Sequence, residues 1–268
     1  MTALTAVRPR ASAVQQWWVL TTRLVAPTLR NGEVLVGVAV SVAVTASLYI
    51  PLNRLMEGPD LGMSYAQYLL PLIVLQAIAF ASISTAFRAA TDSVQGINRR
   101  FGSLPIAPLT PLAARITAAV YRCLIGLAVA IACGYAIGFR FHRGPGYIAA
   151  FCLLAFFTGL ALAILGDTLG TKSRDPAATA QWLLLPQLIF GFLSVGIQPL
   201  QRFPSWIQPI VENQPISRIV DALRAFAGVA DGTGAAVTWS VVGPALAWVA
   251  GIIAVTLPWA IVVYRRRP

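Results

Sequence analysis

Six apolar runs, each long enough to cross a lipid bilayer as a helix, constrain this chain more than any other feature. A membrane-spanning helix needs about 20 mostly apolar residues. Soluble domains carry about 25% charged residues, whereas only 11% of these 268 residues are charged and 57% are hydrophobic. We therefore predict one all-α integral membrane domain over residues 1–268, with six spans at about 33–52, 66–86, 116–138, 146–168, 182–201 and 241–263.

The distribution of the cations orients these spans. Six spans place both termini on one side, and cytoplasmic segments carry an excess of arginine and lysine. The N-terminal segment, the second and fourth loops and the C-terminus hold most of the 20 cations. We therefore expect both termini in the cytoplasm and the chain in the cytoplasmic membrane. The net charge of +11 does not indicate nucleic acid, because the cations cluster at the ends of apolar runs and form no basic face.

Residues 1–32 are expected to form a cytoplasmic tail followed by an interfacial helix. Apolar and aromatic residues, Trp17 and Trp18 among them, recur at helical spacing over residues 14–29. This pattern is typical of an amphipathic helix on the membrane surface, with its tryptophans at headgroup depth. Pro27 is expected to end or bend the helix. A disordered basic tail is the alternative.

The longest polar, cation-rich segment between the predicted spans runs from Arg88 to Arg115. We expect a polar helical turn to start at Thr91-Asp92, Gly96 to interrupt it and Pro105 to prevent a continuous helix. The prediction is a short helix lying across the membrane normal, available to an external partner. It would display Asp92, Asn98, Arg99 and Arg100. An ordinary positively charged cytoplasmic loop is the alternative.

Two polar residues inside the predicted spans suggest contacts between helices. Arg122 costs about 2.5–3.5 kcal/mol at a span centre on insertion scales, but it lies near the inner end, where its long side chain can reach the interface. Asp167 lies at a similar depth in the fourth span, so we predict an Arg122–Asp167 pair that fixes the two spans. Gln76 is expected to bind a neighbouring helix, with substrate contact as the alternative.

The segment 202–240 predicts short structured elements between the last two spans rather than a plain loop. A turn anchored by Trp206 precedes a helix with Pro215 in its first turn, which runs to about Ala227 and ends at Gly228. This helix is too short to cross the bilayer, so it should dip into or lie on the outer leaflet. Its predicted polar face holds Ser217, Arg218, Asp221 and Arg224, with Asp221 and Arg224 paired at i, i+3.

No nucleotide, metal or catalytic site is expected in the chain itself. A phosphate-binding loop needs GxxxxGK[ST], but the sole lysine, Lys172, follows Thr171 where the motif requires glycine. His142 is the sole histidine, and the three cysteines lie inside apolar runs without metal-ligand spacing.

In order and spacing, these motifs resemble the permease subunits of ABC-2 type exporters. The polar loop reads Asp92-x-x-x-Gly96-x-x-Arg99-Arg100-x-x-x-Leu104-Pro105, and the later helix reads Asn213-Gln-Pro215-Ile-Ser217, followed by Asp221-Ala-Leu-Arg224. The stretches NGEVL, FRAATDS, NRRF and CGYAIGFRFHRG are most similar to the daunorubicin-resistance permease (DrrB) branch. The resemblance covers nearly the whole chain. It departs in the polar loop, where many relatives carry several glutamates and this chain has only Asp92.

The resemblance implies a transport subunit, not an enzyme, that exports anthracycline-like drugs or complex lipids such as phthiocerol dimycocerosates. Its ATP and Mg²⁺ would bind a separate cytoplasmic ATPase (DrrA-like), and a DrrC-like paralogue or a second copy would complete the permease within the membrane lipids. The implied coupling helix, within 88–105, would contact the ATPase, and the segment 203–228 would gate the exit. The implied contact residues are Asp92, Gly96, Asn98, Arg99, Arg100 and Pro105, and the implied gating residues are Asn213, Pro215, Asp221 and Arg224.

Two other classes of membrane protein fit parts of the pattern. A secondary, ion-coupled transporter of drugs or lipids would favour repeated halves and an ionisable pair at mid-depth, but no repeat is evident and Arg122 and Asp167 lie near the inner edge. A lipid-modifying membrane enzyme would need a histidine–acid or multi-acid cluster at one surface, whereas this chain has scattered acids and His142.

Overall fold

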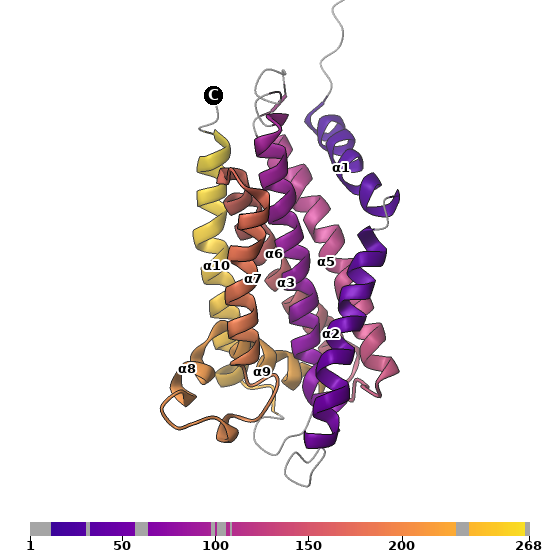
Figure 1. Ribbon diagram of the computed structural model, residues 1–268, viewed down its shortest axis with the longest axis vertical. Helices are drawn as coiled ribbons and strands as arrows, with labels where there is room; N and C mark the ends of the chain where they lie inside the picture. Colours follow the sequence, from indigo (N-terminus) through magenta and orange to yellow (C-terminus); the bar gives the residue numbers. More distant parts are fainter. Residues whose placement is uncertain are drawn as a thin grey trace, which may run out of the picture.

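The computed structural model describes residues 12–30, 33–56, 64–97, 100, 106–107, 109–228 and 236–265, and none of these residues lies in a β-strand. The predicted all-α fold is confirmed for this part of the chain. Long helices run side by side along the molecule (Figure 1). The elements are α1 (Ala13–Arg30), α2 (Glu33–Met56), α3 (Tyr65–Val94), α5 (Thr110–Ala136), α6 (Pro145–Lys172), α7 (Pro176–Phe192), the 3₁₀ turn η2 (Leu200–Arg202), α8 (Gln208–Asn213), α9 (Pro215–Ala227) and α10 (Trp239–Arg265).

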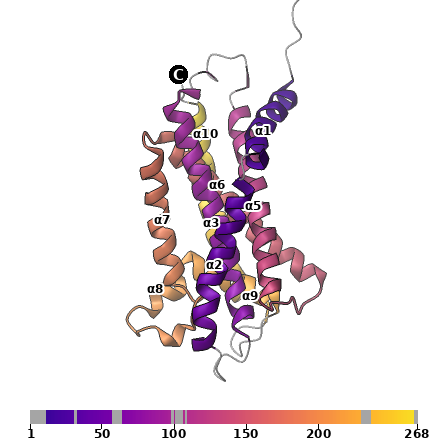
Figure 2. The same ribbon diagram turned by 45° about the vertical axis from the view of Figure 1, so that its right-hand side comes forward.

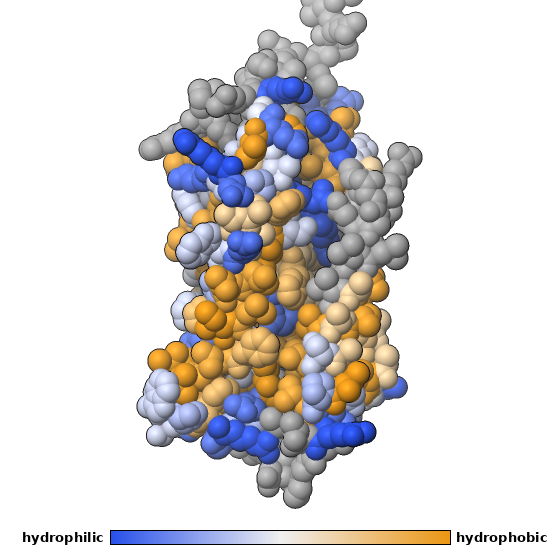
Figure 3. All heavy atoms as spheres, in the orientation of Figure 1, coloured by the Kyte–Doolittle hydropathy of each residue, from blue (hydrophilic) through white to orange (hydrophobic). Residues whose placement is uncertain are grey.

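Four of the described helices, α3, α5, α6 and α10, are long and apolar enough to cross a membrane. They coincide with four of the six predicted spans. Figure 3 shows hydrophobic residues gathered across the middle of one face, with hydrophilic residues towards both ends. This banding is expected of side chains that meet hydrocarbon in the middle and water at the ends.

The most buried of these helices is α3, which contacts α2, α5, α6, α7 and α9. Helices α3 and α6 approach closely because α6 has glycine at the contact. A Cβ at Gly166 would lie 2.7 Å from the Ser82 carbonyl oxygen, and one at Gly170 would lie 2.1 Å from the Ala86 carbonyl oxygen. Small residues that let two backbones meet are a common means of helix association in membranes.

The short elements lie at opposite ends of the helical bundle (Figures 1 and 2). We call the end that holds α1 and the C-terminal ends of α3 and α10 the loop end. We call the opposite end, which holds α8 and α9, the α9 end. The predicted amphipathic helix is α1, which packs on α5 and continues through Pro27 to Arg30. Trp17 is half-buried and Trp18 is exposed, so α1 retains an apolar surface outside the bundle.

The fifth predicted span, 182–201, is wrong in its second half. Helix α7 ends at Phe192, and Leu193–Gln198 form a turn whose residues Ser194 to Ile197 are buried. Hydropathy did not separate this turn from the helix because both are apolar. The turn is stable away from water because other elements bind its backbone groups, as described below.

Candidate functional site

The loop end contains a buried ionic cluster, here called the Arg115 junction, formed by Asp92, Arg115, Asp167 and Tyr264. The guanidinium of Arg115 donates to the Asp92 carboxylate (2.5 Å) and to Asp167 Oδ1 (3.4 Å). The Tyr264 hydroxyl donates to Asp167 Oδ2 at 2.8 Å. The side chains of Arg115 and Asp167 are only 6% and 2% exposed. The junction therefore ties together α3, α5, α6 and α10.

This geometry corrects two predictions from the sequence. Helix α5 begins at Thr110, so Arg115 is a helical residue and not the end of a loop. It takes the place predicted for Arg122 as the partner of Asp167. Arg122 lies two turns further along α5, about 10 Å away, and donates to Thr85 Oγ1 at 3.1 Å. No ion pair joins Arg122 to Asp167 among the described residues, although both line one small cavity.

The predicted coupling residues fall into three groups. Asp92 does not begin a new helix but lies in the last turn of α3, and its carboxylate binds Arg115. Gly96 adopts a positive φ of 69° just after α3, and the backbone N–H of the exposed Arg100 donates to the Gly96 carbonyl at 3.2 Å. The remaining three, Asn98, Arg99 and Pro105, lie outside the described residues.

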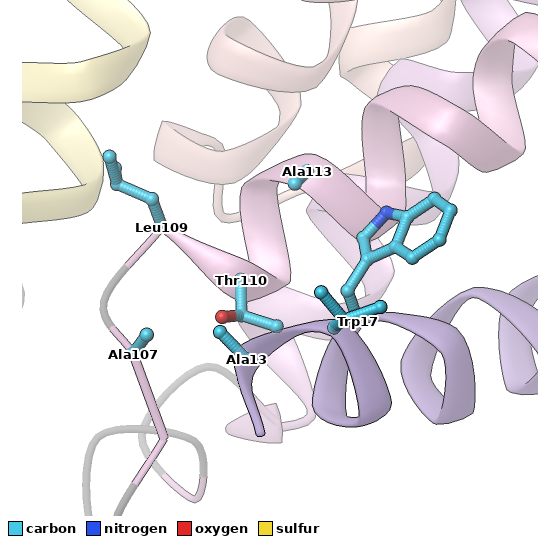
Figure 4. Close-up of a pocket in the computed structure, with 7 residues that line it drawn as sticks. Ala13, Trp17, Ala107, Leu109, Thr110 and Ala113 are labelled. Atoms are coloured by element: carbon cyan, nitrogen blue, oxygen red, sulfur yellow. The ribbon is translucent and has the colours of Figure 1, made fainter.

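Helix α1 and the start of α5 enclose a shallow apolar hollow of about 360 Å³ beside this loop. Figure 4 shows Trp17 of α1 beside Ala113 and Thr110 of α5. The Trp17 indole N–H donates to Thr117 Oγ1 at 3.2 Å, and the Ala107 N–H donates to Gln16 Oε1 at 3.3 Å. Helix α1 is thus bound to α5 and to Ala107, which precedes α5 in the chain.

At the α9 end, the predicted Asp221–Arg224 pair is present at 3.0 Å. The predicted polar face does not all meet solvent, however, because Arg218 and Asp221 are half-buried and Ser217 and Arg224 are buried. The Arg224 guanidinium donates to the backbone carbonyls of Val195 (3.1 Å) and Tyr68 (3.3 Å) and lies 3.9 Å from the centre of the Tyr68 ring. Arg224 therefore faces the bundle and anchors α9 to the turn after α7.

Non-helical backbone at membrane depth is tolerated where other protein groups bind it, and the turn at Leu193–Gln198 meets this condition. Its backbone groups bind side chains from α3, α9 and the residue that precedes α9. The Tyr68 hydroxyl and Arg224 donate to the Val195 carbonyl, the Tyr65 hydroxyl donates to the Ile197 carbonyl, the Gln214 amide donates to the Leu193 carbonyl, and the Val195 N–H donates to Ser217 Oγ.

The remaining predicted gating residues, Asn213 and Pro215, lie where α8 ends and α9 begins. Asn213 is the last residue of α8, donates to the Pro209 carbonyl (2.9 Å) and accepts from Arg218 (2.7 Å). Pro215 occupies the first turn of α9, and Gly228 ends that helix with φ 83°, both as predicted. Trp206, predicted to anchor the preceding turn, is 75% exposed.

A cavity of about 320 Å³ lies between α3, α6, α7, α9 and α10. Its walls are mostly aliphatic, with Gln76 and Gln187 among the few polar residues. The Gln187 amide N–H donates to Gln76 Oε1 at 2.7 Å. The predicted interhelical role of Gln76 is therefore confirmed. Its partner was missed, because nothing in the sequence aligns positions 111 residues apart.

Comparison with known proteins identifies the family of this helical domain. The model for the ABC-2 family transporter proteins matches residues 39–262. The chain belongs to this family. This ABC-2 protein is therefore a multi-pass membrane subunit of an ABC transporter, a transport component rather than an enzyme. The predicted family is confirmed.

Three relatives of this chain are permeases named for doxorubicin or daunorubicin resistance. It is 48% identical to the doxorubicin resistance ABC transporter permease protein DrrB of Mycobacterium tuberculosis, over 97% of this chain and 92% of the relative. It is 31% identical to the probable doxorubicin resistance permease protein DrrC of the same organism, over 74% of this chain and 69% of that one. It is 29% identical to the daunorubicin resistance permease protein DrrB1 of Streptomyces coeruleorubidus, over 78% and 71%.

Proposed function

We propose that this ABC-2 permease exports lipophilic, amphipathic molecules from the cytoplasmic membrane. The observation that carries the proposal is the cavity between α3, α6, α7, α9 and α10, because none of the residues that line it is charged. A hydrophilic substrate would require charged or extensively polar walls within the membrane. The names of the relatives suggest anthracycline-like drugs as substrates, and a long-chain surface lipid is the other candidate of matching chemistry.

The energy source in this proposal is a separate cytoplasmic ATPase that binds ATP and Mg²⁺ and docks at the loop end. The exposed Arg100 and the neighbouring Arg99 supply positive charge for that contact. The Arg115 junction then provides a mechanical connection, because Asp92 in the last turn of α3 is bound through Arg115 to Asp167 of α6. A movement of the loop would therefore be transmitted to α3, α5 and α6 together.

The proposed topology has six spans, with α2 and α7 added to the four long apolar helices. Helix α2 has 24 residues, and α7 has 17 residues before the buried turn extends its apolar path. The excess of cations in the N-terminal segment, the second and fourth loops and the C-terminus supports cytoplasmic termini. The α9 end would then face outward, where α9 could gate the exit.

A second permease subunit would complete the translocation path. Helix α7 supports this part of the proposal, because Trp182, Leu185 and Ile189 on it are each more than half exposed. Such a surface fits lipid or another permease. The relative DrrC indicates the kind of paralogue that could fill this role, and a second copy of this chain is the alternative.

Co-purification with the ATPase encoded beside the permease tests the proposal. The test variant carries Arg99→Glu and Arg100→Glu, and the matched control carries Arg54→Glu and Arg202→Glu, two exposed arginines predicted on the opposite side. We expect wild type and control to recover the ATPase and the test variant to lose it while still inserting in the membrane. Equal recovery by the test variant would move the docking surface elsewhere. If wild type recovers no ATPase, the proposed docking of a separate ATPase at the loop end is wrong.

A further inference from the structure

A cavity of about 180 Å³ lies at the loop end between α1, α3 and α5, and we call it the basic cavity. Among the described residues that line it, three carry a positive charge and one carries a negative charge, so positive charge is in excess by two. These residues are Arg23 of α1, Arg88 and Asp92 of α3, and Arg115 of α5. A cleft lined mainly by cations concentrates anions.

The charges beside the basic cavity do not remove this excess. Asp92 accepts from Arg115 at 2.5 Å, so its charge is already engaged. A smaller cavity adjoins the basic cavity and adds one cation, Arg122, and one carboxylate, Asp167. Asp167 in turn binds Arg115 and Tyr264. The described charges of the two cavities together therefore still have an excess of two positive charges, and like charges held close together repel one another.

The position of the basic cavity indicates the source of the anion. The hydrophobic band lies midway along the bundle (Figure 3), so the loop end lies at the level of the lipid headgroups. Arg23 is exposed on α1, one turn from the exposed Val19, and the cavity therefore borders an apolar surface outside the bundle. Amphipathic surface helices lie at the boundary between headgroups and acyl chains.

We propose that the basic cavity binds the phosphate of an anionic phospholipid. Guanidinium groups bind phosphate through two parallel hydrogen bonds, and basic pockets between transmembrane helices bind anionic lipid headgroups. The cavity is smaller than sites that enclose a whole small molecule, roughly 300–1,000 Å³, so the acyl chains would lie outside it along α1. This inference goes beyond the proposed function, because it does not depend on the molecule that is exported.

A bound phosphate would attach α1 to α3. Arg88 lies in the last two turns of α3, so a phosphate between Arg23 and Arg88 would join the second half of α1 to the end of α3 that leads into the polar loop. Hydrogen bonds of Gln16 and Trp17 already attach the first half of α1. An anionic lipid would thus hold the surface helix against the bundle along its length.

Lipid titration followed by native mass spectrometry tests the proposal on the full-length permease, purified in detergent with any subunit that it retains. The probes are dioleoylphosphatidylglycerol and dioleoylphosphatidylcholine, which share their acyl chains and phosphate, but the choline of the second cancels the negative charge. We expect the Kd for phosphatidylglycerol to be lower by about tenfold or more. Complete displacement of phosphatidylglycerol by equimolar inorganic phosphate would instead assign the cavity to a free anion and overturn the lipid assignment.

Two exposed arginines at the loop end provide a matched pair of variants. Arg23 lines the basic cavity, whereas Arg174, between α6 and α7, does not. Arg23→Gln should raise the Kd for phosphatidylglycerol by about five- to tenfold, and Arg174→Gln should leave it unchanged. Arg23→Lys should retain part of the affinity, because lysine keeps the charge but not the paired hydrogen bonds.

A charge reversal separates lipid binding from a purely structural role of Arg23. Arg23→Glu would place a carboxylate beside the cations of the cavity, so it should abolish the preference for phosphatidylglycerol without lowering the melting temperature in phosphatidylcholine. Phosphatidylglycerol should raise the melting temperature of wild type but not of this variant.

Equal Kd values of wild type for the two lipids, or equal losses of affinity in Arg23→Gln and Arg174→Gln, would contradict the proposal. Neither result depends on recovery of the ATPase, so a failure of this inference is distinguishable from a failure of the proposed function.

Discussion

In the described part of the chain, each end of the bundle buries one arginine, and the two ends compensate its charge differently. At the loop end, the side chain of Arg115 is 6% exposed and lies between two carboxylates, those of Asp92 and Asp167, from two other helices. At the α9 end, the side chain of Arg224 is 5% exposed, and its only carboxylate partner among the described residues, Asp221, comes from its own helix. Its other partners are backbone carbonyls and an aromatic ring.

This difference implies different freedom of movement. If α3 moved away from α5, it would separate Asp92 from Arg115, and the buried Arg115 would lose one of its two carboxylate partners. If α9 moved away from the turn at Leu193–Gln198, Asp221 would travel with Arg224 and the ion pair would survive. We infer that the loop end is built to transmit movement between long helices, and that the α9 end is built to release a short one.

The largest effect is expected at the loop end, for Arg115→Leu. Removing one partner from a buried ion pair destabilises a protein by about 3–5 kcal/mol, and here two carboxylates lose their cation. The matched control is Arg122→Leu on the same helix, where the loss of the bond to Thr85 should cost about 0.5–1.5 kcal/mol. The apparent melting temperatures of the purified complexes measure both. Equal shifts for the two variants would contradict the central role of Arg115.

The next effect is expected at the α9 end, for Arg224→Met. Loss of the bonds to the Val195 and Tyr68 carbonyls should cost about 2–3 kcal/mol, less than Arg115→Leu. Asp221→Asn should cost less than about 1 kcal/mol, because Asp221 is partly exposed. Thermal unfolding measures stability, and co-purification should show undiminished ATPase recovery. A variant that retains its stability but loses the ATPase would reverse the assignment of the two ends.

A smaller effect tests whether the Arg115 junction acts as one unit. Tyr264→Phe removes a hydrogen bond to Asp167 and should cost about 1.5 kcal/mol. Residues in one network are non-additive, whereas distant sites add. Combined with Arg115→Leu, Tyr264→Phe should therefore cost a different amount than alone, and combined with Arg224→Met it should cost the same. Additive melting shifts in both backgrounds would show that Tyr264 is independent of Arg115.

The helices could be predicted from the sequence because their signals are local. Apolar runs of span length predicted α3, α5, α6 and α10. Pro215 and Gly228, thirteen residues apart, predicted the two ends of α9. The sequence also carries a local signal for the position of Arg115. Pro111 belongs in the first turn of a helix, which places Arg115 inside that helix and seven residues before Arg122.

The candidate site depends on contacts that no local pattern encodes. Gln76 and Gln187 are 111 positions apart, and Arg224 and Tyr68 are 156 apart. The sequence pattern predicted the pairing of Arg224 with Asp221 but not the burial of Arg224 against α3. The irregular turn around Val195 instead supplies backbone carbonyls that need donors, and this requirement appears only once the helices are packed.

The smallest of these effects concerns the joint that holds the C-terminal end of α9. Gly228 has φ 83°, and a Cβ there would lie 2.8 Å from Arg143 Cγ, so Gly228→Ala should cost about 1 kcal/mol. Gly146→Ala is the control, because a Cβ at Gly146 would meet nothing within 4 Å. The His142 N–H donates to the Ala227 carbonyl, so this joint links α9 to the turn between α5 and α6. If α9 is the element that moves, Gly228→Ala should alter export of doxorubicin from loaded vesicles more than ATPase recovery, and a loss of ATPase recovery alone would argue against the division between the two ends.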